Sequence, residues 1–490
     1  MIFLIAKKEL IDNWQSRKIV LAFALCAILF SVSFYLALKD YSGRLESYSL
    51  SRESWDDFFA SPVAHYIVEN EHLMVKDDTV GPMGIFRRPT ALSILARGLE
   101  DRMNRPVYFF NPPKYGLQVE LDISGKQEKN KLFSLFSAPD FMYIVKIIVS
   151  LLCILFAFNT ICGEREAGTL ALMMSNSVSR SQILLGKWLG GYTSVVAPFL
   201  AATFLALPLL VFSHRVGFTG EEFLRLGLIV LVALVYIAIF FLIGMLVSAN
   251  TSQSSTAVMF LLAAWVLLVL VIPNSFALLA KEIVPVPSTQ KIAAEKFAKA
   301  REIEDEAQKR RPTSRGTSGY GTVHEEVRPK IKAMMKQIDQ FYEAKRRQRL
   351  ALSQILTRIS PVGAYVYATT GLAQTGIGAE QKYLSQLSQY ELQLEEPFNR
   401  AMGSASILIN RLKKQLPVDP IKRRKVWWNA HEELVRKVKS VLDIPATFRF
   451  PKHQLSETFE NIWLDVLLLV AFWALFFLAA HLSFLRYDVR

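Results

Sequence analysis

Few side chains in this sequence combine the types and spacing that chemistry on a substrate requires. His324 and His431 are each followed by two glutamates, as in some acid/base and metal sites, but both triplets lie in densely charged stretches typical of a solvated helix face. The sequence contains no H-E-x-x-H zinc motif, and neither glycine–lysine pair is followed by the serine or threonine of a phosphate-binding loop. We therefore predict that the chain is not an enzyme and has no catalytic, cofactor-binding or metal-binding residues.

Four ionisable residues lie inside long apolar runs, where a membrane protein usually places functional charges: Lys146, Arg225, Asp465 and His481. Lys146 and Asp465 fall near the same end of two different runs, so they could form an intramembrane pair. The alternative is that each side chain snorkels to the membrane interface. A membrane enzyme or receptor would need a clearer intramembrane acidic or histidine site, so we place that class behind a transport protein.

A charged link, residues 162–187, connects two of these runs. Its first part is charged and bounded by Gly163 and Gly168, which predicts a turn at the membrane surface. Thr169 can cap a short helix whose apolar stripe comprises Leu170, Met173 and Met174. The segment from Ser179 to Gln182 is typical of a capping box that opens the next helix. A short amphipathic helix that passes motion to the spans and an ordinary solvated loop both fit this pattern.

The apolar runs that flank this link define the architecture. The chain has 490 residues, of which 52% are hydrophobic, which is too apolar for a typical soluble protein. Runs of about 20 apolar residues have the length of a transmembrane helix. We predict an all-α polytopic membrane protein with six transmembrane helices, at residues 19–38, 141–161, 189–212, 223–247, 256–280 and 462–484.

The charged link resembles the cytoplasmic signature of ABC-2-type permeases, the membrane subunits of type V ABC exporters, in their large-extracytoplasmic-loop branch. The resemblance rests on Glu164-Arg165-x-x-Gly168-Thr169-Leu170, then Val178-Ser179-Arg180 and Gly186-Lys187. Residues Lys8–Leu10 also resemble the elbow helix of that family. The resemblance implies that the link is a coupling helix docking on a separate ABC ATPase subunit, which would hold ATP and Mg²⁺. The implied ATPase-coupling residues are Glu164, Arg165, Glu166, Gly168, Thr169, Leu170 and Arg180.

Basic residues predict the orientation of the spans. They cluster before the first run, in residues 162–187 and in the tail 485–490, and six spans bring all three clusters to one side. By the positive-inside rule that side is the cytoplasm, in the plasma (inner) membrane of a prokaryote. Residues 1–18 form an apolar–polar helical pattern that predicts an interfacial amphipathic helix. The formal charge of +14 is spread over polar segments, which favours contact with anionic membrane lipid rather than nucleic acid.

Two long segments then lie outside, residues 39–140 and 281–461. The first has aromatic residues for a small core and an alternating strand pattern at 117–123, so it could fold as an α+β domain. The second predicts a helical hairpin from 293–310 and 323–360 around a flexible tip at 311–321, with a disordered loop as the alternative. Residues 361–376 predict a short apolar helix that cannot span a bilayer.

We therefore expect a permease subunit of an exporter-type ABC transporter, working as a homo- or heterodimer with a second permease chain. It would couple ATP hydrolysis by the separate ATPase to transport or to movement of its outer domains. The alternative is a mechanotransmitting subunit that acts on an extracytoplasmic protein without moving a substrate across the bilayer.

Overall fold

The computed structural model describes residues 1–53, 84–85, 87–104, 107–110, 118–121, 139–175, 178–213, 216–309, 319–390, 392–393, 396, 400 and 454–486. Within these residues, six helical stretches are long and apolar enough to cross a membrane. They run over Lys18–Leu50, Phe141–Glu166, Arg180–Val211, Gly220–Asn250, Ser254–Ile283 and Leu455–Leu485. The prediction of an all-α polytopic membrane protein with six spans is confirmed.

Four of the spans are single helices, namely α2 (Lys18–Glu53), α10 (Arg180–Val211), α11 (Gly220–Asn250) and α19 (Leu455–Leu485). The other two contain a π-helical turn. The second span is built from α6 (Phe141–Ile144), the π turn η2 (Val145–Val149) and α7 (Ser150–Ala157). The fifth is built from α12 (Ser254–Trp265), the π turn η3 (Val266–Val271) and α13 (Ile272–Ile283). Such turns widen the hydrogen-bond ladder and release backbone carbonyls from it.

Side chains from neighbouring elements bind the two π turns. The carbonyl of Lys146 in η2 accepts hydrogen bonds from Ser150 Oγ at 2.6 Å and from the Tyr236 hydroxyl at 3.1 Å. The carbonyl of Leu268 in η3 accepts one from Ser360 Oγ at 2.8 Å. Trp265 Nε1 donates to Ser150 Oγ at 2.9 Å, which joins the second span to the fifth. Both irregularities are therefore held by specific partners.

Apolar side chains of the spans form one core, with α11 as its most buried helix. Phe30, Phe141 and Phe199 pack as aromatic rings with centroid separations of 5.3–6.0 Å, joining three spans. Small residues allow helices to approach closely. A Cβ atom on Gly191 would overlap the ring of Phe241, and one on Gly244 would overlap Ala157.

The N-terminal helix α1 (Ile2–Gln15) packs across the start of α10. A Cβ atom on Gly186 would lie 2.8 Å from Ile5 Cβ, and one on Gly190 would lie 2.6 Å from the Ala6 carbonyl oxygen. The two glycines therefore form the groove in which α1 lies. The position of α1 at a membrane interface stays a prediction, although Trp14 is largely exposed as that prediction requires.

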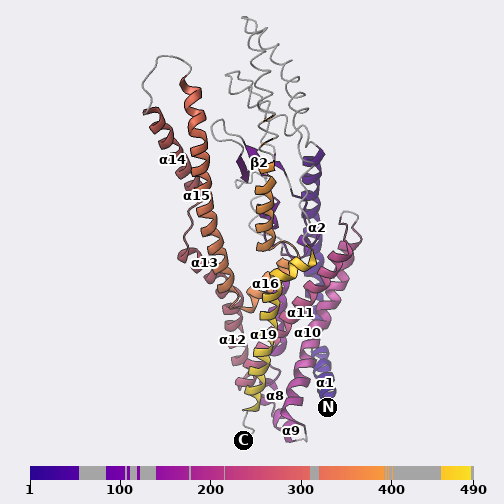
Figure 1. Ribbon diagram of the computed structural model, residues 1–490. Helices are drawn as coiled ribbons and strands as arrows, with labels where there is room; N and C mark the ends of the chain where they lie inside the picture. The colour runs from indigo at the N-terminus through magenta and orange to yellow at the C-terminus, as the bar shows by residue number, and fades with distance from the viewer. Residues whose placement is uncertain are drawn as a thin grey trace.

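A long helical hairpin projects from the opposite end of the bundle to α1, α8 and α9 (Figure 1). It consists of α14 (Thr289–Lys309) and α15 (Gly319–Thr357), in agreement with the predicted helical hairpin. The predicted tip at 311–321 falls partly outside the described residues. The hairpin has a core of its own, made by Ala300, Val327, Ile331 and Met335. With 39 residues, α15 is about 58 Å long, which is longer than a bilayer core is thick.

After the hairpin the chain folds back as the short helix α16 (Pro361–Leu372) and a helix at 377–390. Ser360 caps α16, which packs against α11 and α19. This confirms a short helix in the predicted 361–376 segment.

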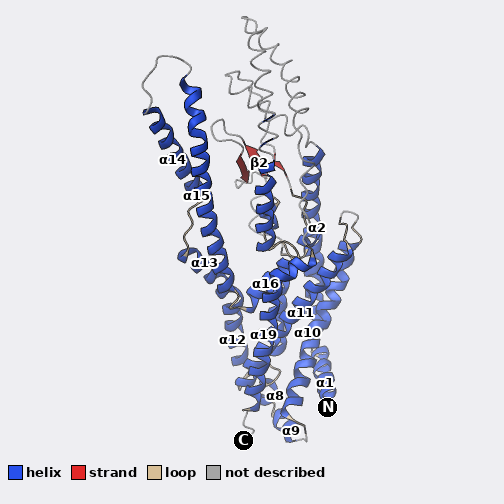
Figure 2. Ribbon diagram, viewed as in Figure 1, coloured by secondary structure: helices blue, strands red, loops and turns tan. Residues whose placement is uncertain are grey.

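Residues 39–140, the first of the two segments predicted to lie outside, are described only in part. Its described residues form η1 (Ala91–Ile94), α4 (Glu100–Met103) and an antiparallel sheet in the order β1-β2-β3, from Gly84–Ile85, Val107–Phe110 and Gln118–Leu121 (Figure 2). Strand β3 coincides with the predicted strand at 117–123. Most of this segment lies outside the described residues, so an α+β domain here stays a prediction. The part between η1 and α4 is attached to the turn after α16, because Leu99 N donates to the Thr375 carbonyl at 2.7 Å.

Candidate coupling site

The charged link folds as two short helices between the second span and α10. They are α8 (Cys162–Glu166) and α9 (Thr169–Ser175), and Gly168 between them has a φ of +69° that a side chain would disfavour. The predicted capping box is present, because Ser179 Oγ accepts from Gln182 N and Gln182 Oε1 accepts from Ser179 N. We call α8, the turn and α9 the link helices.

A fully buried lysine joins the link helices to two other elements. Lys187 of α10 lies 2.6 Å from Glu9 Oε1 in α1 and 2.7 Å from Glu164 Oε2 in α8. Its Nζ also donates to the carbonyl of Thr160 at 2.9 Å. Lys8 approaches the other carboxylate oxygen of Glu164 at 3.4 Å. A buried lysine is stable only with such partners, so this cluster fixes α1, α8 and α10 together.

Further bonds tie the link helices to the remaining spans. Glu166 accepts from Ser254 N at 2.8 Å and from Ser254 Oγ at 2.6 Å, which places a carboxylate at the N-terminus of α12. Ser248 Oγ of α11 accepts from the backbone N–H of Cys162 at 3.1 Å. Arg180, just after the link helices, donates to the carbonyl of Leu485 at the end of α19. Movement of the link helices would therefore act directly on α1, α10, α11 and α12, and α10 is in turn bonded to α19.

The apolar side chains of α9 divide between two directions. Leu170 is buried, and Met173 and Met174 pack against the bundle core. The predicted apolar stripe thus anchors α9 to the spans. Leu172 points outward and is 69% exposed, and the neighbouring Thr169 and Glu166 are exposed as well. A partner would therefore meet Leu172 rather than Leu170.

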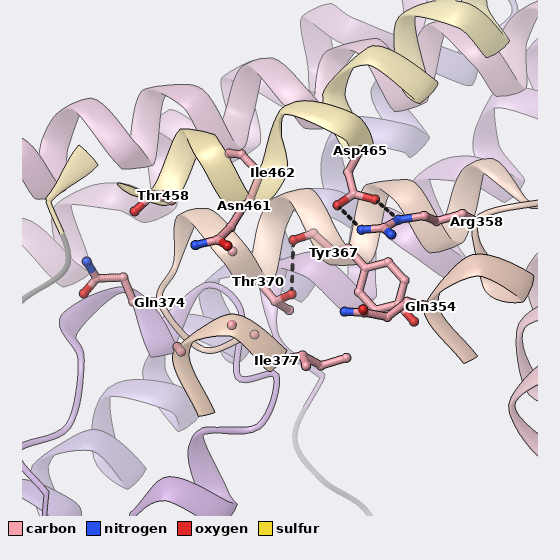
Figure 3. Close-up of a pocket in the computed structure, with 14 residues that line it drawn as sticks. Gln354, Arg358, Tyr367, Thr370, Gln374, Ile377, Thr458, Asn461, Ile462 and Asp465 are labelled. Atoms are coloured by element: carbon pink, nitrogen blue, oxygen red, sulfur yellow. Dashed lines mark hydrogen bonds and ion pairs between the residues drawn. The ribbon is translucent and has the colours of Figure 1, made fainter. Parts of the chain in front are cut away.

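The other predicted pair, Lys146 with Asp465, is replaced by a different one. Asp465 accepts from Arg358 Nε at 2.6 Å and Nη2 at 2.9 Å, in a two-bond arrangement (Figure 3). Its hydrogen bonds to Asp465 raise the pKa of the Arg358 guanidinium. Lys146 instead lies over the ring of Tyr143, with Nζ 5.1 Å from the centroid. The prediction of a Lys146–Asp465 pair was wrong because span counting assigns Arg358, between α15 and α16, to a loop outside the bundle. In the structure its side chain reaches α19 and binds Asp465.

The other two ionisable residues predicted inside apolar runs, Arg225 and His481, also have partners. Arg225 is buried and donates to Glu221, to Thr458 at 2.9 Å and to the Leu372 carbonyl at 3.2 Å. His481 stacks on Phe477.

Sequence reasoning missed Lys187 and Glu9 as site residues. The Gly186-Lys187 pair was the available signal, but a lysine beside an apolar run is usually interfacial, and its partner Glu9 is 178 positions away.

Comparison with known proteins identifies the family of the chain. One relative, the probable ABC transporter permease protein NosY of Stutzerimonas stutzeri, is 31% identical over 127 residues. That match covers 25% of this chain and 45% of the relative, so it spans less than half of the relative's length. A family model described as ABC-2 family transporter protein matches residues 3–489, nearly the whole chain. This multi-pass membrane protein therefore belongs to the ABC-2 family of transporter proteins.

Proposed function

We propose that the chain is the permease subunit of an exporter-type ABC transporter. In this proposal a separate ATPase subunit binds the link helices and transmits its conformational change to them. One observation carries the proposal. The link helices are bonded to α1, α10, α11 and α12, while the side chain of Leu172 is exposed at the surface of α9. A segment with an exposed apolar contact and rigid inward bonds is suited to transmit force.

In this mechanism, ATP binding closes two ATPase subunits beneath a dimer of permease chains. The push on α9 passes through Glu164 to Lys187 and α1, and through Glu166 to α12. The spans then move about the dimer interface and change the relative position of the outer segments.

The mechanism places the link helices in the cytoplasm. Both the start of α1 and the end of α19 lie at that end of the bundle (Figure 1). In a chain with its buried native cysteines replaced, Ser175→Cys should react with an impermeant thiol reagent only after the membrane is opened, whereas Gln340→Cys on α15 should react in intact cells. Labelling of Ser175→Cys from outside would reverse the orientation.

The docking role is tested by Leu172→Arg. Leu172 is exposed, so the change costs the permease little stability but puts a charge into an apolar contact. We expect normal membrane insertion with loss of ATPase association, measured by co-purification from membranes. Phe341→Arg is the matched control, because Phe341 is an exposed apolar residue of the hairpin. If the wild type, Leu172→Arg and Phe341→Arg recover equal amounts of the ATPase, α9 is not part of the interface.

A second candidate function, mechanical action on an extracytoplasmic protein, is favoured by the hairpin's length and by its separate core. The test removes residues 298–337 and joins the helices with a short Gly/Ser loop. This deletion keeps the ion pair between Lys296 and Asp339, at 2.6 Å, and the ends of α14 and α15 that are nearest to the spans. We expect a membrane-inserted complex that keeps its ATPase but loses function in cells. Normal function would make the hairpin dispensable and favour the plain exporter.

A further inference from the structure

A polar cavity of about 60 Å³ lies between the end of α15, α16, the helix at 377–390 and α19. Its lining is rich in hydrogen-bonding side chains. Its lining includes Gln354, Arg358, Gln374, Gly378, Asn461 and Asp465. Figure 3 shows the Arg358–Asp465 pair at one end of the cavity and Gln374 at the other. The cavity is distant from the link helices and is not used by the proposed coupling mechanism.

The two charged groups of the cavity have opposite signs. Asp465 is 2% exposed and Arg358 is 18% exposed, so the carboxylate is the more deeply buried of the two groups. A ligand with a single charge would be attracted by one group and repelled by the other. A ligand that carries an anion and a cation a few bonds apart matches both.

The surroundings place this cavity at the level of lipid headgroups. It begins where the apolar part of α19 begins, and at the same level the opposite side of α19 exposes Phe459, Trp463 and Leu467 at helical spacing. Exposed aromatic residues at span ends are typical of the membrane–water boundary. On the α15 side, Ile355 and Ile359 are also exposed. A lipid chain could therefore lie along Ile355 and Ile359 while its headgroup enters the cavity.

One wall of the cavity has a backbone conformation that requires explanation. Gln374 has a φ of +60°, which is uncommon for a residue other than glycine. Such conformations persist only where the surroundings impose them, and they cluster at ligand sites. Here the conformation turns the chain from α16 into the helix at 377–390, which brings Gly378 opposite Asn461 and forms the cavity.

We propose that this cavity binds the headgroup of a zwitterionic phospholipid, with the phosphate facing Arg358 and the ammonium facing Asp465. Asn461 supports this assignment. Its Nδ2 donates to the Glu457 carbonyl at 2.9 Å, which fixes the amide and orients Oδ1 as an acceptor for the ammonium. The Gln354 amide, at the α15 side of the cavity, can donate to phosphate oxygens. Both charges of the headgroup thereby exchange water for charged or polar partners.

The test measures lipid retained by the purified full chain in native mass spectrometry, after incubation with equal amounts of phosphatidylethanolamine and phosphatidylglycerol. Wild-type protein should retain phosphatidylethanolamine by about tenfold over phosphatidylglycerol, the effect of one additional charge-assisted hydrogen bond. Gly378→Leu should abolish this preference by filling the cavity. Its control is Gly227→Leu on α11, where a Cβ atom meets nothing within 4 Å.

A double variant, Arg358→Gln/Asp465→Asn, removes both charges without leaving either one unpaired. It should also lose the preference, and soluble phosphoethanolamine should compete with the lipid in wild-type protein only. Equal retention of the two lipids by the wild type would show ordinary boundary lipid and overturn the proposal. So would an unchanged preference in folded Gly378→Leu.

Discussion

The two ends of this bundle are fastened in different ways. At one end the link helices are tied to several spans through the buried cluster of Lys187, Glu9 and Glu164. At the other end the α14–α15 hairpin has its own core, and its ion pair between Lys296 and Asp339 is partly exposed. The first end behaves as part of the bundle, whereas the second is a unit attached to it. Under the proposed mechanism, a displacement imposed at the link helices would be shared among the spans, and the hairpin would move as one body.

The largest expected effect comes from Lys187→Met. This change leaves Glu9 and Glu164 facing each other in a buried site, and breaking a buried charge cluster costs about 3–5 kcal/mol. Thermal unfolding of the detergent-purified chain should show a large fall in the melting temperature. An unchanged melting temperature would mean that the cluster is well solvated and that the two ends differ less than their bonding indicates.

The next effect compares equal apolar truncations in the two regions. Ile331 in the hairpin and Leu184 in the bundle are both nearly fully buried, so replacing either by Ala should cost about 2–4 kcal/mol. Hydrogen exchange should show Ile331→Ala increasing exchange only in α14 and α15. Leu184→Ala should affect several spans. Faster exchange throughout the bundle in Ile331→Ala would contradict the independence of the hairpin.

A smaller effect is expected where α1 meets α10. Gly190→Ala places a methyl group against the Ala6 backbone, and overpacking of this kind costs about 1–3 kcal/mol. The expected result is a lower melting temperature and faster proteolysis of α1. Gly227→Ala, which has open space around it, is the control and should be neutral or slightly stabilising. If both variants behave alike, α1 is not held in a close groove.

The smallest effect is that of Lys296→Met in the hairpin. Lys296 is 23% exposed and Asp339 is 51% exposed, and partly exposed pairs contribute about 0–1 kcal/mol. The melting temperature should hardly change, in direct contrast to Lys187→Met. A large fall would show that the hairpin pair also holds the architecture together.

Local sequence patterns predicted those features that depend on neighbouring residues. The six apolar runs, the capping box at Ser179 and the two hairpin helices are of this kind. The first span shows the limit, because hydropathy marks residues 19–38 while α2 continues to Glu53 beyond the apolar part. Side-chain partners could not be predicted in the same way. Lys187 and Arg358 each bind residues more than 100 positions away, and such pairs are set by how the helices pack.

The π turn η3 (Val266–Val271) has a consequence for the direction in which the hairpin points. A π turn is equivalent to one residue inserted into an α-helix, and each α-helical residue rotates the chain by about 100°. Everything beyond η3, including α13 and the hairpin after it, is rotated by that amount relative to α12. A one-residue deletion in this span would keep its length and hydropathy nearly unchanged while moving the hairpin to another azimuth around the bundle. The direction in which the hairpin points is thus determined by a single extra residue in the fifth span.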